Sequence, residues 1–498
     1  MSGRGCLKTD ISEVQMERIT TTIPQAEVDR QLKYCQEIAR MNADRGETPL
    51  AFVDTYGCQQ NEADSERIRG YLRQMGYDFT TDEEQARIIV LNTCAIREHA
   101  EQRVLGNLGA LVHVKRRHPE QIICLCGCMA QEAHVAEKVR QSFRHVDLVF
   151  GPHVLWKFPE FIHTLLTQRG RIFSNADDPG SIAEGIPVVR QDKVKAWVSI
   201  MYGCNNFCSY CIVPYVRGRE RSRRPEDILA EVRQLAEEGY HDITLLGQNV
   251  NSYGRDLYGS PRFAQVLDAL DQTGIERLRF ATSHPKDLND EVVGRFATLR
   301  SLMPALHLPV QSGSDAVLAA MNRRYTRDHY RALVAKLRDA VPDIALSTDI
   351  IVGFPGETAK DFEDTYRLVD EVGYHQVFTF IYSKREGTPA ASMDDDTPRE
   401  VIQQRFDRLV DLVQQRAFEA NQRDLGSTVD VLVEGASKRD ERLLAGKSPK
   451  NQTVHAPAPA GVRAEDLAGS TVRVRVDEAK TWYLAGEIVD GPDAADGR

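Results

Sequence analysis

The sequence contains no long apolar segment. None of its apolar runs reaches the ~18 residues that a membrane-spanning helix needs, and residues 1–10 contain no apolar signal segment. We therefore expect a cytoplasmic protein with no membrane partner. The chain also lacks an excess of basic charge, because its formal net charge is -10. The surface as a whole will not attract nucleic acid, so any RNA binding must come from local basic patches.

Cysteine is too sparse for a disulfide scaffold. Ten cysteines are spread over 498 residues, and a cytosolic protein keeps its thiols reduced. Reduced thiols that cluster along a chain suggest a bound metal. The ten are Cys6, Cys35, Cys58, Cys94, Cys124, Cys126, Cys128, Cys204, Cys208 and Cys211.

The order of apolar and polar segments predicts an α/β protein of several domains. Residues 1–48 form a polar leader with one amphipathic helix, in which Val28, Cys35 and Ile38 recur at helical spacing. Residues 49–168 alternate short apolar strands with helices, which implies a parallel sheet. The strands expected there are 50–56, 87–92, 121–126 and 146–150. Residues 169–192 contain several Gly, Pro and Asp residues without a period, which predicts a linker.

A second α/β block covers residues 193–424. Strands and helices alternate six times, which suits a barrel or partial barrel with its active site at the C-terminal strand ends. The strands expected are 196–202, 243–246, 278–281, 305–310, 344–352 and 377–382. Short alternating runs in 425–490 predict a small all-β barrel. Residues 491–498 form a frayed tail.

The densest cysteine motif follows the first strand of the second block. Cys204, Cys208 and Cys211 have the spacing C-x3-C-x2-C. Structural zinc takes four ligands, usually as two C-x2-C pairs, and here three thiols stand together. In a [4Fe-4S] cluster three thiolates leave one iron open to a substrate. The spacing therefore favours an iron–sulfur cluster over zinc.

This motif on the first strand of a β/α barrel resembles the radical S-adenosylmethionine (SAM) enzymes. The resemblance implies that the open iron chelates SAM, and that reduction of the cluster gives a 5'-deoxyadenosyl radical. It also implies that Tyr210, beside the third cysteine, lies near the adenine of SAM. Gln248 and Asn249 occupy the place where such enzymes often carry Gly-Gly-Glu. Further SAM contacts are expected at the later strand ends, at Gln311, Ser312, Gly353, Pro355, Gly356 and Glu357.

Three other cysteines share a position in the first block. Cys58, Cys94 and Cys128 each follow a predicted parallel strand. Adjacent strand ends meet in one crevice, so the three thiolates are candidates for a second cluster with an open iron. Buried structural thiols are the alternative, and we expect this for Cys124 and Cys126.

The strings around these cysteines resemble the N-terminal domain of the methylthiotransferases, and are most similar to the tRNA 2-methylthio-N6-isopentenyladenosine synthases. The resemblance runs from about residue 49 to 490. It implies an N-terminal methylthiotransferase domain, a radical SAM core and a C-terminal RNA-binding TRAM barrel. The strings that carry it are 55–61, 92–98, 127–131, 213–220, 246–251, 308–314, 348–357 and, in the TRAM barrel, 446–451.

Basic residues in two segments are candidates for RNA contact. Arg217, Arg219, Arg221 and Arg223 follow the cluster motif, and arginine binds phosphate through its bidentate fork. A solvated basic loop is the alternative. In the TRAM barrel, Lys447 and Lys450 lie on a turn similar to one that recurs in that domain.

The resemblance implies a reaction that converts N6-isopentenyladenosine at position 37 of tRNA to its 2-methylthio derivative. One SAM would donate a methyl group and another would supply the radical, because the target C–H bond has no acidic proton. Two [4Fe-4S] clusters, an electron donor such as a flavodoxin or ferredoxin, and a sulfur source are the expected cofactors and partners. The alternatives are a threonylcarbamoyladenosine tRNA or ribosomal-protein methylthiotransferase, or a non-catalytic RNA-binding metalloprotein.

Overall fold

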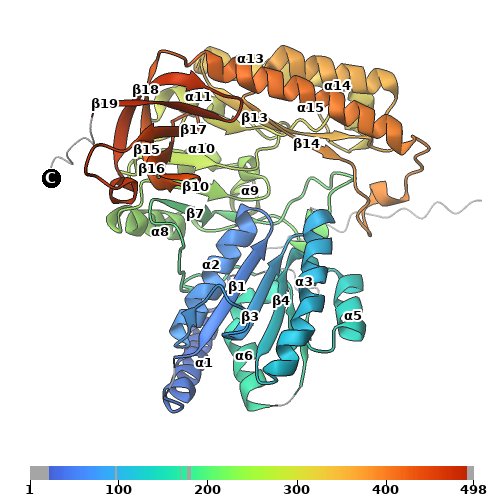
Figure 1. The fold of residues 1–498 in the computed structure, drawn as a ribbon. Helices are drawn as coiled ribbons and strands as arrows, with labels where there is room; N and C mark the ends of the chain where they lie inside the picture. The colour runs from blue at the N-terminus through green and yellow to red at the C-terminus, as the bar shows by residue number, and fades with distance from the viewer. Residues whose placement is uncertain (1–21, 47, 96–97, 169, 176–180, 491–498) are drawn as a thin grey trace, which may run out of the picture.

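The computed structural model describes residues 22–46, 48–95, 98–168, 170–175 and 181–490. An N-terminal sheet domain lies beneath a central barrel domain, and a small β-barrel flanks the central domain (Figure 1). The predicted α/β multi-domain architecture is therefore confirmed. Cys6, residues 1–21 of the predicted leader and the predicted tail fall outside the described residues.

Six parallel strands form the sheet of the N-terminal domain, in the order β2-β1-β3-β4-β5-β6. The four predicted strands are present, and two short edge strands, β2 and β6, were not predicted. β6 lies inside 169–192, so the expectation of an irregular linker throughout this segment is wrong. The strands are β1 (Leu50–Tyr56), β2 (Asp78–Phe79), β3 (Ala86–Thr93), β4 (Ile122–Gly127), β5 (Leu148–Phe150) and β6 (Ile172–Ser174).

Helices cover both faces of this sheet. Ile88 and Val90 of β3 pack in a cluster with α1, α2 and α6, whereas Ile89 and Leu91 pack with α3 and α5 on the other face. Because both faces are buried, the central strands are almost continuously apolar. The predicted amphipathic helix is α1, which starts after Pro24. The helices are α1 (Gln25–Ala43), α2 (Gln59–Gln74), α3 (Glu98–Arg117), α4 (Cys128–Gln131), α5 (Ala133–Ser142), η1 (Pro152–Lys157) and α6 (Phe158–Thr167).

Six parallel strands form an open barrel in the central domain, as predicted. They make two sheets, β11-β10-β7 and β12-β13-β14, which a parallel bridge between Leu278 and Leu302 joins. The strands are β7 (Lys195–Ser199), β10 (Asp242–Leu246), β11 (Arg277–Phe280), β12 (Ala305–His307), β13 (Ala345–Val352) and β14 (Gln376–Ile381), with the short pair β8 (Met201–Tyr202) and β9 (Arg221–Ser222) at one end.

Helices cover the outer face of the open barrel and enclose the largest apolar core of the protein. They include the long α15, which packs against β14. The helices are α7 (Val213–Val216), α8 (Pro225–Glu237), η2 (Val250–Ser252), α9 (Arg255–Tyr258), α10 (Phe263–Asp271), α11 (Asp290–Thr298), α12 (Asp315–Ala320), α13 (Arg327–Ala340), α14 (Ala359–Val372), η3 (Pro389–Ser392) and α15 (Arg399–Gln422).

The prediction of a small all-β barrel is confirmed, and the C-terminal domain is a closed barrel of five strands in the order β15-β16-β17-β19-β18. Its β16–β17 turn docks on β11 of the central domain: Arg277 donates to the carbonyl of Lys447 at 2.6 Å, and Arg279 donates to that of Pro449 at 2.9 Å. The elements are β15 (Thr428–Ser437), β16 (Asp440–Lys447), β17 (Thr453–Pro457), η4 (Ala464–Leu467), β18 (Thr471–Ala479) and β19 (Tyr483–Asp490).

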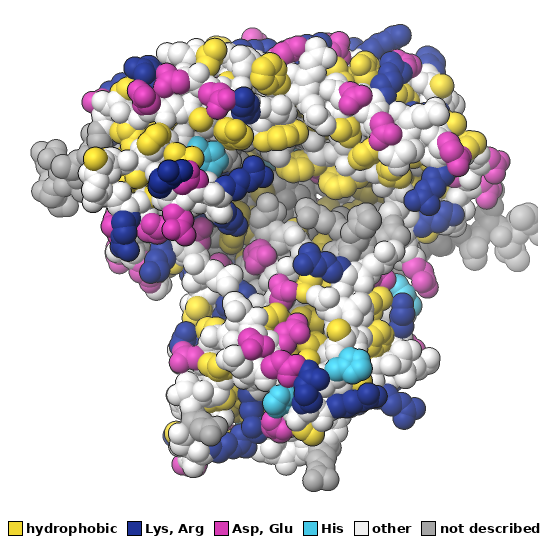
Figure 2. All heavy atoms as spheres, viewed as in Figure 1, with side chains coloured by type: hydrophobic (Ala, Val, Ile, Leu, Met, Phe, Trp, Pro, Cys, Tyr) yellow, Lys and Arg dark blue, Asp and Glu magenta, His cyan; other side chains and the backbone are white. Residues whose placement is uncertain are grey.

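The surface is hollowed where the central domain overhangs the N-terminal domain, and hydrophobic side chains gather along the overhanging edge (Figure 2). Strand β14 at the end of the open barrel exposes Phe378, Phe380 and Ile381. Among the described residues, no helix has both the length and the apolar character needed to cross a lipid bilayer.

Candidate active site

The structure brings Cys58, Cys94 and Cys128 to one edge of the N-terminal sheet. They directly follow, or follow by one residue, β1, β3 and β4, which are neighbours in the sheet. Cys58 caps the N-terminus of α2, and Cys128 is the first residue of α4. The backbone N–H of Cys94 donates to the carbonyl of Tyr56 at 2.8 Å, which ties the second thiol to the first strand.

A buried amide network fixes this edge. Asn61 Nδ2 donates to Asn92 Oδ1 and to the Thr93 carbonyl, both at 3.2 Å. Asn92 Nδ2 donates in turn to the Asn61 carbonyl at 2.8 Å and to Ser65 Oγ at 2.9 Å. The Cys58 thiol lies 3.3 Å from Asn61 Oδ1. Satisfied buried networks of this kind hold side chains in one arrangement, so the thiols are positioned before any ligand binds.

The thiols of this set differ in their electrostatic surroundings. A hydrogen bond from Cys94, aided by the nearby charge of Arg217, lowers the pKa of Cys58 to about 6 against the opposing effect of burial. Burial raises the pKa of Cys128, although Arg217 opposes that shift. Burial, with a smaller effect of nearby charges, raises the pKa values of Cys124 and Cys126 well above the usual range of a thiol. Cys124 and Cys126 lie in the sheet core, as predicted.

One guanidinium joins the central domain to this cysteine set. Arg217 Nε donates to Cys128 Sγ at 3.0 Å, and Arg217 Nη2 donates to Asp64 Oδ2 at 2.7 Å. Beside it, Ile212 and Val216 of the central domain pack with Ala95 and Cys128 in one buried apolar cluster. The residue next to Cys211 therefore touches the second cysteine set.

The C-x3-C-x2-C loop lies at the C-terminal end of β7 and β8. Its first cysteine is fixed by a hydrogen bond from the Cys204 N–H to the Gly218 carbonyl at 3.1 Å. Its second is approached by a buried cation, since Arg323 Nη1 lies 3.5 Å from Cys208 Sγ and 3.3 Å from the Tyr210 hydroxyl. Arg323 also donates to the carbonyl of Pro309 at 2.6 Å. Tyr210 thus packs between the loop and the barrel.

Both cysteine sets have the chemistry of cluster ligands. Each offers three largely buried sulfurs and one buried arginine within reach of a sulfur, and a cation stabilises thiolates. Within the described residues, no group of three His, Cys, Asp or Glu side chains is arranged to hold a single ion. A [4Fe-4S] cluster binds each cysteine through a different iron, so its ligands need not meet at one point.

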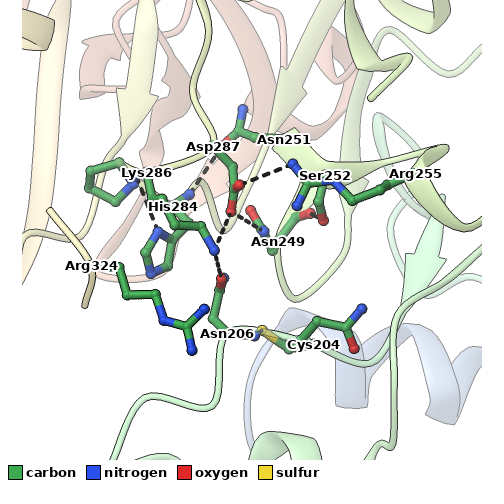
Figure 3. Close-up of polar contacts among 12 residues, drawn as sticks. Cys204, Asn206, Asn249, Asn251, Ser252, Arg255, His284, Lys286, Asp287 and Arg324 are labelled. Carbon is green, nitrogen blue, oxygen red and sulfur yellow. Dashed lines mark hydrogen bonds and ion pairs between the residues drawn. The ribbon is translucent and has the colours of Figure 1, made fainter. Parts of the chain in front are cut away.

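Polar side chains gather in front of the loop, at the ends of β10 and β11 (Figure 3). Asp287 accepts from Asn249 Nδ2 at 2.8 Å and lies 3.5 Å from Lys286 Nζ. Lys286 Nζ reaches across to Asn206 Oδ1 at 2.5 Å. The His284 N–H donates to Asn251 Oδ1 at 3.1 Å. These contacts link the cysteine loop to the second and third strands of the barrel.

Several buried polar atoms at this place have no partner within the described part of the chain. His284 Nδ1 accepts from the N–H of Lys286 at 3.2 Å, and burial lowers the pKa of the ring, so the neutral imidazole carries its proton on Nε2. Buried polar groups are normally paired, so a set of unpaired ones marks a binding site. The unpaired atoms are Asn206 Nδ2, Asn249 Oδ1, Asn251 Nδ2, Ser283 Oγ and His284 Nε2.

This polar set fits SAM, whose amino, carboxylate and ribose groups need donors and acceptors beside the cluster. The sequence analysis found Asn249 but missed Asn206, Asn251, His284 and Lys286. Their signal was position, because Asn206 lies inside the cysteine motif and the other three follow the second and third strands, whose ends line the active site of a β/α barrel. Arg323 gave no such signal, since it follows the short α12 rather than a strand.

Several predicted SAM residues also hold the fold together. Gln248 Oε1 accepts from the N–H of Gly203 at 2.5 Å. Ser312 Oγ lies 3.1 Å from Thr365 Oγ1. Glu357 Oε1 accepts from the N–H of Gly353 at 3.2 Å and from Arg405 at 2.9 Å.

The two remaining segments of that prediction lie on turns of the barrel. Gln311 has a φ of +71°, unusual for a residue with a side chain. Pro355 and Gly356 lie on the turn after β13.

The structure corrects most of the predicted RNA contacts near the cysteine loop. Arg217, Arg221 and Arg223 are buried, with 5, 7 and 5% of their surfaces exposed. Arg223 pairs with Glu184 and Glu231, each at 2.7 Å. Arg221 donates to the carbonyls of Arg217 and Arg219 at 3.1 and 3.0 Å. A buried, paired guanidinium is not available to a phosphate. Arg219 is the exposed member of the four, and its guanidinium stacks 4.3 Å from the Phe207 ring centre.

The predicted RNA contacts of the TRAM turn are also corrected. Lys447 Nζ donates to Thr453 Oγ1 at 3.0 Å within the barrel. Lys450 pairs with Asp424 at 2.9 Å and with Asp343. Both lysines belong to the turn that docks on the central domain, so their charges are used inside the protein. Lys438 and Arg439, on the turn between β15 and β16, are exposed.

Comparisons with known proteins agree with this architecture. Family models match residues 51–151 (uncharacterized protein family UPF0004), 198–369 (radical SAM superfamily) and 422–489 (TRAM domain). Among solved structures, the radical SAM methyltransferase TsrM from Kitasatospora setae, solved with tryptophan and a SAM analog, shares the fold with a TM-score of 0.52 at 13% identity. That match covers 69% of this chain and 75% of TsrM.

Curated relatives match almost the whole chain. The tRNA-2-methylthio-N(6)-dimethylallyladenosine synthase of Acetivibrio thermocellus is 45% identical over 96% of this chain and 100% of its own length. The synthase of the same name from Clostridium perfringens strain 13 is 47% identical over 89% of this chain and 98% of its own length. These matches confirm the resemblance found in the sequence. The chain therefore belongs to the tRNA-2-methylthio-N(6)-dimethylallyladenosine synthase family of radical SAM enzymes.

Proposed function

We propose that the protein is a radical SAM methylthiotransferase that acts on N6-isopentenyladenosine (dimethylallyladenosine) at position 37 of tRNA and attaches a methylthio group to carbon 2. The observation that carries this proposal is the contact between the two cysteine sets. Ile212, which follows Cys211, packs against Ala95 and Cys128 across the domain interface. A reaction that joins a sulfur group to a radical-activated base needs both centres at one interface.

Each cysteine set holds one [4Fe-4S] cluster in this proposal. Cys204, Cys208 and Cys211 bind the cluster that cleaves SAM, and the three N-terminal cysteines bind the other. When bound, SAM and the clusters supply the methyl group, the sulfur site and the 5'-deoxyadenosyl radical. The chain's part is to bind and orient them.

The unpaired polar atoms described above are suited to hold SAM. Neutral His284 offers an N–H donor from Nε2, and Asn251 offers one from Nδ2. Asn249 offers an acceptor from Oδ1, which suits the amino group of SAM in place of the carboxylate that other radical SAM enzymes often carry. Arg323 holds the Tyr210 hydroxyl, so the tyrosine is placed for the adenine.

The proposal includes partners that the chemistry requires. Reducing a cluster takes a one-electron donor such as a flavodoxin or ferredoxin, and the inserted sulfur needs its own source. We place the reaction in the cytoplasm with its tRNA substrate. The name shared by the relatives favours the isopentenyl substrate over threonylcarbamoyladenosine or a ribosomal protein.

Iron counts and product analysis test the proposal together. After anaerobic reconstitution we expect about eight irons per chain, and about four when Cys58, Cys94 and Cys128 are replaced by alanine. The variant should form 5'-deoxyadenosine from SAM but should not produce the 2-methylthio nucleoside from isopentenylated tRNA. The matched control is Cys124→Ala with Cys126→Ala, which removes core thiols and should retain about eight irons.

Two outcomes would contradict the proposal. A triple variant with the parent's iron content and normal methylthiolation would refute the second cluster. Methylthiolation of threonylcarbamoylated tRNA, with none of isopentenylated tRNA, would refute the substrate while leaving the reaction type intact.

A further inference from the structure

Arg217 is a central-domain residue whose side-chain contacts lie in the N-terminal domain. Its Nε donates to Cys128 Sγ at 3.0 Å and its Nη2 donates to Asp64 Oδ2 at 2.7 Å. Its backbone N–H is bonded to the Val213 carbonyl at 2.8 Å, which fixes the residue at the end of α7. A side chain held at both ends has one orientation, with Nε toward the sulfur.

Asp64 lies near two arginines, one from its own helix and one from the central domain. Arg67 lies 3.7 Å from Asp64 on the same helix, and Arg217 lies 2.7 Å from it. The charge of Glu231 also acts on Arg67, whereas Asp64 is the carboxylate that Arg217 is paired with. The Arg217 side chain is 5% exposed, and a buried charge is costly unless it is paired. Besides Asp64, the groups closest to the Arg217 charge are the sulfur atoms of Cys128 and Cys58, and Cys128 accepts a hydrogen bond from it.

We propose that Arg217 is the positioning residue that sets the reduction potential of the second cluster, acting on it from the opposite domain. The inference rests on the proposed function, because it requires a cluster at Cys58, Cys94 and Cys128. A hydrogen bond to a ligand sulfur and a nearby positive charge both stabilise the reduced cluster, which carries one more negative charge. Arg217 therefore raises the potential, and does so only while the two domains are docked.

The test measures the potential of the second cluster by itself. In the full-length chain, Cys204→Ala, Cys208→Ala and Cys211→Ala remove the SAM cluster, so that one signal remains in a titration followed by electron paramagnetic resonance. In this background we expect Arg217→Gln to shift the midpoint potential to a more negative value. Asp64→Asn removes a negative charge from the same ion pair, so we expect it to shift the potential in the opposite direction.

Two further variants separate charge from packing. Arg217→Lys keeps the charge, so its potential should stay closer to the parent's than that of Arg217→Gln. Arg219→Gln is the matched control, because it removes an equal charge from the same loop while the Arg219 side chain stacks on Phe207. We expect its potential to equal the parent's.

The outcomes distinguish this inference from the function on which it rests. If the background chain binds no iron, the second cluster is refuted, and the role of Arg217 with it. If iron binds but Arg217→Gln leaves the potential unchanged, the role of Arg217 alone is refuted. If Arg217→Gln does not retain iron, the Arg217→Lys variant is measured instead. A cluster with a potential near the parent's in Arg217→Lys supports the inference, and loss of iron from Arg217→Lys overturns it.

Discussion

Gly127 and Gly203 are two of the three glycines that stand one position before a cysteine that we assign to a cluster. Gly127 has a φ of +95° and Gly203 a φ of +74°, in the region that side chains disfavour. A Cβ on Gly203 would lie 2.0 Å from the Arg219 carbonyl oxygen, and one on Gly127 would lie 2.3 Å from Asn92 Oδ1. Each cysteine is therefore placed by a backbone turn that only glycine allows.

Gly127→Ala should displace Cys128 and weaken the second cluster while sparing the first. We expect the iron content after reconstitution to fall from about eight toward about four per chain, with 5'-deoxyadenosine formation retained. The control is Gly106→Ala on α3, where a Cβ meets nothing within 4 Å and helix propensity favours alanine by about 1 kcal/mol. Full iron content in Gly127→Ala would contradict this account of the turn.

Replacing Cys208 tests the assignment of the C-x3-C-x2-C cysteines to the SAM cluster. Its replacement by alanine removes a thiolate that approaches Arg323 at 3.5 Å, so the SAM cluster should be lost. We expect no 5'-deoxyadenosine from SAM under dithionite, measured by chromatography of single-turnover mixtures. Production at the parent rate would show that the loop is not the SAM site.

Among the elements, the N-terminal helix α1 was expected in a polar leader but packs on the N-terminal domain as part of its core. Val28, Cys35 and Ile38 form its buried stripe, and Cys35 and Ile38 join the core beneath the sheet. Ile38→Ala should lower the free energy of local unfolding of this domain by about 2 to 4 kcal/mol through the cavity it leaves. Hydrogen exchange of β3 and α2 amides measures that loss. Gln36→Ala, on the exposed face, should leave the exchange rates unchanged.

The pattern of apolar residues in the sequence predicted the central strands, which are covered by helices on both faces of the sheet. β3 and β4 are apolar along almost their whole length, so their signal was strong. β2 has two residues and β6 has three, too few for any period, and β6 lies in a segment that resembles a linker in composition. Edge strands of this length are defined by the sheet they join rather than by their own sequence.

The parts of the site that depend on residue spacing were predicted from the sequence. The parts that depend on contacts between residues distant in the sequence were missed. The cysteine sets follow from strand ends and from C-x3-C-x2-C. The burial of Arg217 and Arg223 could not be predicted, because a run of arginines is usually solvated and their partners Asp64 and Glu184 are distant in sequence. The same holds for Lys450, whose partner Asp424 is 26 residues away.

At the scale of the whole molecule, the formal net charge is -10, so we expect tRNA to be bound through the exposed cations. Arg219 lies beside the cysteine loop, and Lys438 lies on the TRAM barrel. We expect alanine at either position to reduce the log–log salt slope of tRNA binding by about one unit, because one phosphate contact is lost. Binding measured across a salt series gives the slope.

Lys447→Ala is the control for this prediction. It makes an equal change of charge, but Lys447 is paired with Thr453 in the turn that docks on the central domain. We expect an unchanged salt slope and a lower melting temperature. A loss of slope as large as that of Arg219→Ala would mean that the docked turn opens to meet RNA.

The contact between Arg217 and Cys128 also bears on the order in which the protein is synthesised and its second cluster is assembled. The two residues are 89 positions apart in the chain, and a ribosome adding 5–20 residues per second takes roughly 4 to 18 s to cover that distance. A nascent chain thus displays all three N-terminal thiols before the guanidinium that balances them exists. Iron delivered in that interval would meet a half-built site, so faithful biogenesis favours loading the second cluster after the central domain has been synthesised and has docked.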